Sequence, residues 1–291
     1  MATSGENIAM PADETKTDDY YTYVEGVGNI PRDIYKHVKS DPLGDLPRYS
    51  IHIVIQHFLT FLTFLILAST GLTLHFSDLW WSPYVMSIFG GPDVARLIHR
   101  VSAFFMIAAS LYHIGTLIGG TMNKIMKKEF DVKRTQIPLL KDARDIVHDF
   151  RYFIGREPHR PKMYKFMYKQ KLHYIAIIWG TFVLVTAGTS LLFPETMATI
   201  WPNPEFFQDL ARLMHADEAI MAITVVVFWH WSNVHLVPGR FPLQWSFLTG
   251  RITREHQIEE HFLEYINNLK EIPEERDYIK KILREKGHDT H

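Results

Sequence analysis

The sequence contains no cysteine, and this single absence removes several classes of site. Without thiols the chain can form no disulfide, attach no c-type haem and hold no cysteine-ligated iron–sulfur cluster. Any redox metal centre within it must therefore rely on other ligands, chiefly histidine or methionine. The chain has 16 histidines and 11 methionines to supply them.

The chain also lacks an excess of either charge, since 31 Lys and Arg residues stand against 32 Asp and Glu residues. This balance argues against a nucleic-acid-binding protein, which would carry a basic excess. The N-terminal residues are polar and acidic, with neither the basic stretch nor the apolar core of a signal peptide. No cleaved leader is therefore expected.

Four stretches are nearly devoid of charged side chains and are long enough to cross a bilayer. No proline interrupts them. The fold class that they predict is all-α, an integral membrane four-helix bundle. The predicted spans cover about residues 51–76, 94–120, 172–193 and 211–238.

The segments outside the spans divide the rest of the chain. We predict a polar N-terminal tail (1–50), a long loop (121–171) and a charged, partly helical C-terminal tail (239–291), with a short surface helix at 142–153. The long loop holds fourteen Lys and Arg residues, whereas the two short connections hold almost none. The positive-inside rule therefore places both termini and the long loop in the cytoplasm.

Histidines within the spans carry the functional argument, because an imidazole inside a membrane is costly and needs a reason. His215 and His230 are fifteen residues apart in the fourth span. That spacing corresponds to about 60° of net rotation and about 22 Å along the helix axis. His99 and His113, fourteen residues apart in the second span, likewise share one face at two depths.

The four-span topology sorts these histidines into two levels. His99 and His215 lie near the outer face, while His57, His113 and His230 lie at matched depth near the inner face. Imidazoles are axial ligands of haem iron, and bundle interiors are where such cofactors bind. The pattern predicts two bis-histidine b haems, the inner one using His230 with either His57 or His113.

Five short runs also stand in a recognisable order along the chain. They are Gln56-His57-Phe58, Thr70-Gly71-Leu72, Arg96-Leu97-Ile98-His99-Arg100, Gln170-Lys171 and Arg212-Leu213-Met214-His215-Ala216. Together they resemble the four-helix dihaem cytochrome b subunits of membrane-bound formate dehydrogenases and nickel–iron hydrogenases. The resemblance covers about residues 48–265.

This resemblance implies a set of ligands and partners. An outer haem would be held by His99 and His215, an inner haem by His57 and His230, and a quinone would bind beside the inner haem. Partner subunits carrying iron–sulfur clusters or several haems would lie on the extracytoplasmic side, in a prokaryotic cytoplasmic membrane. The quinone candidates, whose alternative role is as interfacial anchors or haem-propionate partners, are Gln170, Lys171, His173 and His235.

Two features depart from that family pattern. The spacing in the fourth span is fifteen residues where fourteen is expected, and His113 is additional. With two histidines on each of two parallel helices, the layout also resembles the cytochrome b of quinol–cytochrome c complexes. The inner haem would then use His113 and His230, although His57 and His230 are slightly favoured.

Two other classes of function compete with electron transfer. A His-lined transporter for protons or metal ions would place acidic residues among the histidines, and only Asp217 and Glu218 do so, close to the outer end. A passive membrane anchor would explain the apolar spans but not the matched histidines.

Overall fold

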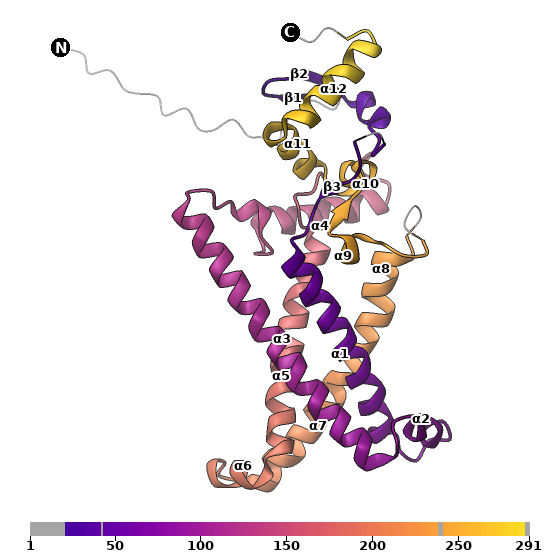
Figure 1. Cartoon of the computed structure of the whole chain (residues 1–291), viewed down its shortest axis with the longest axis vertical. Coiled ribbons are helices and arrows are strands. Elements are labelled where there is room, and N and C mark those ends of the chain that lie inside the picture. The colour runs from indigo at the N-terminus through magenta and orange to yellow at the C-terminus, as the bar shows by residue number, and fades with distance from the viewer. Residues whose placement is uncertain (1–20, 42, 238–240, 289–291) are drawn as a thin grey trace, which may run out of the picture. The chain divides into compact units, whose positions relative to one another are not determined.

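The structure, a computed structural model, describes residues 21–41, 43–237 and 241–288 (Figure 1). Most of these residues are helical, which confirms the all-α prediction in its coarse form; the strands are only two to four residues long. The chain divides into two compact units. We call residues 46–161 and 166–252 the helical unit, and the described parts of 1–45, 162–165 and 253–291 the terminal unit.

Three helices of the helical unit are long and apolar enough to cross a membrane among the described residues. They are α1 (Ile51–His75), α3 (Pro92–Met126) and α5 (Tyr168–Leu192). The first three predicted spans are therefore each present as a helix long and apolar enough to cross a membrane, which suggests a membrane protein. Many of their large apolar side chains are exposed, as helix faces in contact with lipid would be.

The fourth predicted span (211–238) is helical in consecutive pieces. Helix α7 (Pro204–Thr224) continues into a π-helical segment, η3 (Val225–Trp231), and then into α8 (Ser232–His235). Asn203 caps the start, because its side chain accepts a hydrogen bond from the Phe206 N–H. Residue 238, the predicted end of the span, lies outside the described residues.

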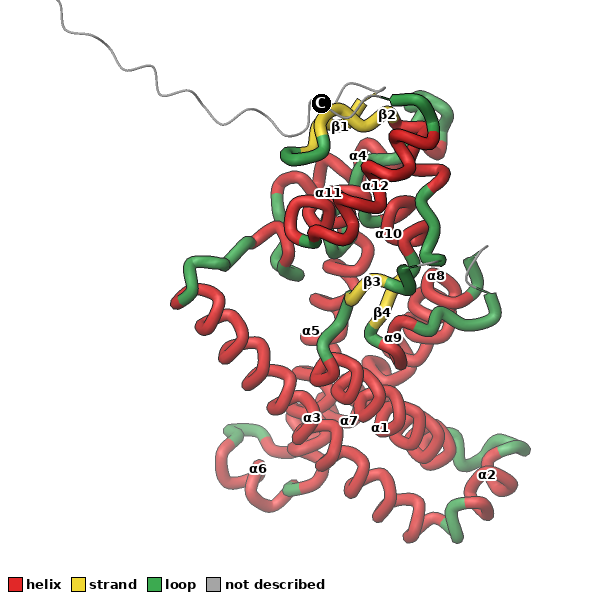
Figure 2. The backbone as a smooth tube through the Cα atoms, turned by 45° about the horizontal axis from the view of Figure 1, so that its top comes forward, coloured by secondary structure: helices red, strands yellow, loops and turns green. Residues whose placement is uncertain are grey.

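The long helices pack as two main pairs. Helix α1 packs along α3, and α5 packs along α7, while α1 also touches α7 (Figures 1 and 2). Short helices lie in the connections: α2 (Ser82–Ile88) between α1 and α3, and α6 (Pro194–Ile200) between α5 and α7. Side chains from both pairs can therefore meet inside this unit.

The two ends of the helical unit are joined by backbone hydrogen bonds. Strand β3 (Leu46–Pro47) pairs antiparallel with β4 (Arg251–Ile252), which follows the short helix α9 (Ser246–Thr249). The N–H groups of residues 48 and 49 both donate to the Gly250 carbonyl, at 2.8 and 2.9 Å. Gly250 has φ +69°, and a Cβ there would lie 2.7 Å from the Tyr49 carbonyl oxygen, so only glycine fits.

The predicted surface helix is present as α4 (Leu140–Phe153), preceded by a 3-10 turn, η2 (Val132–Arg134). Its amphipathicity is reversed from that of a soluble protein. Leu140, Val147 and Phe150 are 84%, 52% and 64% exposed, whereas three aspartates are buried. Those aspartates are Asp142, Asp145 and Asp149.

The buried aspartates of α4 are paired with cations. Asp142 accepts a hydrogen bond from Lys171 of α5 at 2.8 Å, and Asp149 accepts one from Arg160 at 2.9 Å. Burial opposes ionisation of Asp149, but hydrogen bonds from Arg160 and Tyr168 outweigh it and hold the pKa of this carboxyl below its usual value. These pairs fix α4 against the first turn of α5.

The terminal unit is built from segments near both ends of the chain. It contains a hairpin of β1 (Tyr21–Val24) and β2 (Gly28–Pro31), the 3-10 helix η1 (Arg32–His37), and the helices α10 (Arg254–Glu260), α11 (Phe262–Glu271) and α12 (Pro273–Glu285). Its core includes Ile34, Tyr265 and Ile279. The segments predicted as two separate tails, 1–50 and 239–291, thus contribute to one folded unit.

Candidate functional site

His99 of α3 and His215 of α7 face each other in the helical unit, and we call them the outer pair. Their ring centroids are 6.3 Å apart and their planes make an angle of 73°. His215 Nδ1 lies 3.2 Å from the Leu184 carbonyl oxygen, and His99 Nδ1 lies 2.9 Å from Thr70 Oγ1. Both rings are therefore anchored through Nδ1.

The acceptors of these hydrogen bonds determine the tautomers. A carbonyl oxygen only accepts, so His215 must donate from Nδ1. The Thr70 hydroxyl already donates to the Ile66 carbonyl at 2.7 Å, so His99 Nδ1 donates to Thr70 as well. Each neutral ring of the outer pair consequently carries its lone pair on Nε2, the atom available to a metal.

Two glycines give the outer rings room. A Cβ on Gly71 of α1 would lie 3.2 Å from His99 Cε1, and a Cβ on Gly188 of α5 would lie 3.0 Å from His215 Cε1. Both distances are shorter than ordinary van der Waals contact. Each imidazole therefore packs directly on the backbone of a neighbouring helix, which holds the ring in place.

His57 of α1 and His230 of the π-helical segment form a second facing couple, the inner pair. Their ring centroids are 6.4 Å apart, with planes at 36°. His173 of α5 stacks on His230 with centroids 4.8 Å apart and planes at 13°, and Phe247 of α9 lies 5.4 Å from His57. Aromatic rings thus surround the inner pair, whereas hydrogen bonds anchor the outer pair.

The π-helical segment accounts for the unexpected fifteen-residue spacing between His215 and His230. In a π turn the backbone bonds run i→i+5 instead of i→i+4, so one such turn takes up one additional residue. Fifteen residues that include this turn rotate about as far as fourteen in a regular α-helix. His230 is thereby kept in line with His57.

His113 is not brought to His230, and its ring belongs to a hydrogen-bonded chain. The Gln56 amide nitrogen donates to Thr116 Oγ1 at 2.7 Å, so the Gln56 oxygen is an acceptor, 2.9 Å from His113 Nδ1. His113 Nδ1 therefore donates, and its Nε2 accepts from the Tyr174 hydroxyl at 2.8 Å. Both nitrogens of this ring are occupied.

The four predicted quinone residues fall into two groups. Gln170 Oε1 accepts from the Met167 N–H at 3.1 Å, and the Lys171 ammonium is fully buried against Asp142, so both support the start of α5. His173 lies on the inner pair, and its buried Nδ1 has no hydrogen-bond partner among the described residues. His235 accepts from the Gln244 N–H at 3.0 Å, and its ring lies 5.8 Å from Phe247.

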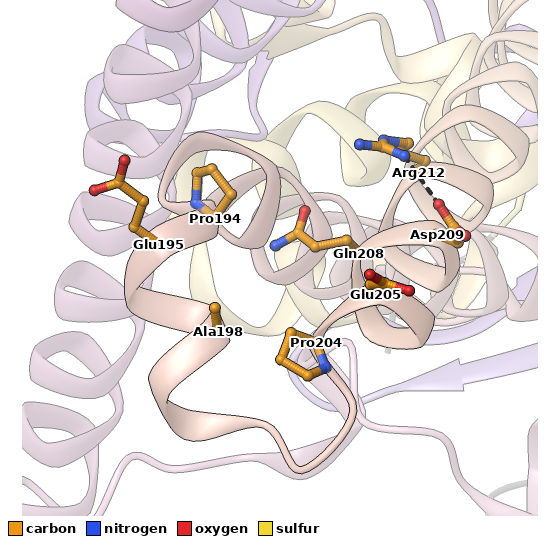
Figure 3. A pocket seen from close by; sticks show the side chains of 8 residues that line it. All are labelled: Pro194, Glu195, Ala198, Pro204, Glu205, Gln208, Asp209 and Arg212. Atoms are coloured by element: carbon orange, nitrogen blue, oxygen red, sulfur yellow. Dashed lines mark hydrogen bonds and ion pairs between the residues drawn. The ribbon is translucent and has the colours of Figure 1, made fainter.

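An open pocket lies between α6 and the start of α7 (Figure 3). Its lining includes the ion pair of Arg212 with Asp209 at 2.9 Å. None of the predicted histidines lines it. The remaining lining residues are Pro194, Glu195, Ala198, Pro204, Glu205 and Gln208.

Comparison with known proteins does not assign the chain to a family. No protein-family model matches the sequence, and no curated protein proves similar to it. The functional conclusion therefore depends on the sequence pattern and on the geometry of the two histidine pairs.

Proposed function

We propose that this chain is the membrane cytochrome b subunit of a quinone-linked oxidoreductase complex, in which two bis-histidine b haems carry electrons across the membrane. The observation that supports this most strongly is the nearly equal ring separation of the two pairs, 6.3 and 6.4 Å. Metal–imidazole bonds are about 2.0–2.1 Å long, so rings at these separations would leave room for one metal ion between the two imidazoles of each pair.

The imidazole donors of both pairs are of the kind that binds haem iron. The chain offers no thiolate, so nitrogen ligands are the expected donors. In the outer pair, the Nδ1 hydrogen bonds leave Nε2 as the donor atom, which is the arrangement that orients metal-ligating histidines in general. A bound haem supplies the one-electron chemistry.

The chain's own residues have three tasks in this function. The histidines hold and orient the two cofactors, and the apolar helices exclude water from them. About 22 Å of helix separates His215 from His230, so the two levels lie near opposite sides of a hydrocarbon core about 30 Å thick. Electrons would pass between an extracytoplasmic partner subunit, the outer pair, the inner pair and a quinone.

The proposed membrane arrangement has four spans, formed by α1, α3, α5 and the α7–η3–α8 stretch. Both termini and the loop that contains α4 lie on the cytoplasmic side, because that loop holds fourteen Lys and Arg residues. The exposed apolar face of α4 is of the kind that lies in the interfacial layer of a membrane. The membrane in this proposal is the cytoplasmic membrane of a prokaryote, as the family resemblance implies.

The quinone is proposed to bind beside the inner pair, where His173 and His235 supply polar ring atoms and Phe247 an aromatic face. The His113 ring donates to the Gln56 oxygen and accepts from the Tyr174 hydroxyl, so His113 and Tyr174 could exchange a proton. Gln170 and Lys171 would act through the position of α5, since the Gln170 oxygen and the Lys171 ammonium already have hydrogen-bond partners there.

The proposal is tested by purifying the whole chain in detergent and recording reduced-minus-oxidised spectra. We expect a b-type α band and two haems per chain. A colourless protein, folded by circular dichroism, would contradict electron transfer and leave the His-lined transporter as the better function. One haem per chain would show that only one of the two pairs binds iron.

A further inference from the structure

We propose that the terminal unit binds a divalent transition-metal ion of the zinc class at His256, Glu260 and His261. One ligand atom from each of these residues lies within 4.8 Å of the others. His256 and Glu260 are four residues apart on α10, so they share one face of the helix. His261 follows at the break between α10 and α11, and the break turns its ring toward the same point.

The environment of His261 is the second observation that indicates a metal ligand. Its side chain is only 1% exposed, and its Nδ1 lies 3.0 Å from the Tyr164 carbonyl oxygen. Because a carbonyl only accepts, Nδ1 carries the proton and Nε2 carries the lone pair. A ring N–H donated to a backbone carbonyl is the usual outer support of a metal-bound histidine.

The ligand set suits zinc in particular. Two imidazoles and one carboxylate are three protein ligands of a tetrahedral ion, with the fourth position available to water. Bonds of about 2.0–2.2 Å require ligand atoms about 3.3–3.6 Å apart, so the three side chains would move together by about 1 Å. His256 and Glu260 can make this movement, since their side chains are 14% and 15% exposed.

A simpler arrangement of the same residues is a hydrogen-bonded pair. His256 Nε2 lies 3.2 Å from a Glu260 carboxylate oxygen, which is an i, i+4 contact within α10. Such a pair would exist without metal, whereas a metal site also needs His261. The two arrangements differ in whether the buried ring of His261 takes part. A measurement of zinc binding decides between them.

The experiment titrates zinc into the full chain, purified in detergent and dialysed against a chelator, with bound metal measured by elemental analysis and calorimetry. Removing a metal ligand should weaken binding by more than the roughly 10–100-fold lost with an outer partner. We therefore expect the native chain to bind one zinc ion. The His256→Gln and Glu260→Gln variants should each bind zinc more than about 100-fold more weakly than the native chain does. Zinc should raise the melting temperature of the native chain but not that of His256→Gln or Glu260→Gln.

His37→Gln is the matched control, because His37 is an exposed histidine on η1 of the same unit. This variant should bind zinc and gain thermal stability as the native chain does. His261 is left unchanged, so that the core stays intact. A chain that binds no zinc, or His256→Gln and Glu260→Gln chains that bind it as tightly as the native chain, would overturn the proposal.

Discussion

The outer and inner histidine pairs have almost the same ring separation but different support. In the outer pair both Nδ1 atoms are hydrogen-bonded, to Thr70 and to the Leu184 carbonyl. Neither His57 nor His230 has such a bond among the described residues. Their rings are held by His173 and Phe247, which contribute packing without fixing a tautomer.

Under the proposed function, this difference would give the two pairs different roles. A hydrogen bond to Nδ1 orients the ring and raises its basicity as a ligand, so the outer pair is suited to a fixed relay position. The inner pair has a protonatable neighbour in His173, and the hydrogen bond of His113 with Tyr174 involves the residue that follows His173 in α5. It is suited to a step in which electrons and protons are exchanged together.

The largest expected effect is on haem content. His99→Ala and His215→Ala should each remove the outer haem alone, and His230→Ala the inner haem alone, so each variant keeps about half the haem of the native chain. His57→Ala should match His230→Ala, whereas His113→Ala should keep both haems. A pyridine haemochrome assay measures this directly. Loss of the inner haem in His113→Ala, with retention in His57→Ala, would reverse the ligand assignment.

A one-residue deletion tests the π-helical segment. Removing Val227 shortens the spacing of His215 and His230 to fourteen, so the segment can become a regular α-helix with His230 still in line. We expect both haems to remain. Removing Leu65 from α1 is the control. The residues of α1 after this position, including Thr70 and Gly71, would turn by about 100° relative to His57, so the outer haem should be lost. Haem loss on removal of Val227 would contradict this account.

Substituting the glycines should affect the outer pair alone. Gly188→Leu would place side-chain atoms in the space of the His215 ring, because even a Cβ at this position would lie only 3.0 Å from His215 Cε1. We expect the outer haem to be bound only in part and the inner haem in full, as measured by low-temperature spectra of the two α bands. Gly115→Leu is the control, since a Cβ at that position of α3 meets nothing within 4 Å. Equal losses in both variants would mean that bulk, and not ring contact, is responsible.

The smallest expected effect is on redox potential. The inner haem potential should fall as pH rises, by up to about 59 mV per pH unit for one proton per electron, and the outer potential should change much less. Tyr174→Phe removes the hydroxyl on His113 Nε2 and should flatten the inner slope only. Redox titrations at several pH values measure both. Equal slopes for the two haems would remove the functional distinction between the pairs.

The sequence predicts the parts of this structure that depend on local composition. Long runs of apolar residues predict membrane helices, and three of them are confirmed as helices of sufficient length and hydropathy. The helical period predicts which histidines of one helix share a face, and the family resemblance implies the pairings; the structure places His99 opposite His215 and His57 opposite His230. Whether these pairs bind haem stays a prediction.

Other features depend on tertiary contacts that cannot be predicted from the types of the residues involved. The acceptor for His215 is a backbone carbonyl, which every residue has, so Leu184 could not be identified from the sequence. The π turn did leave a signal, because the fifteen-residue spacing was one longer than expected. The burial of Lys171 against Asp142, twenty-nine residues away, required the fold itself.

The pairing of β3 with β4 has a consequence for how the chain can be rearranged. The helical unit begins and ends at hydrogen-bonded neighbours, so its backbone is nearly a closed ring. Neighbouring termini are what make circular permutation feasible. A short linker could join residues 46 and 252, and new ends could be opened between α2 and α3, without breaking any of the four long helical stretches. Such a permutant would separate the helical unit from the two end segments of the terminal unit, while residues 162–165 of that unit would stay in the loop between α4 and α5.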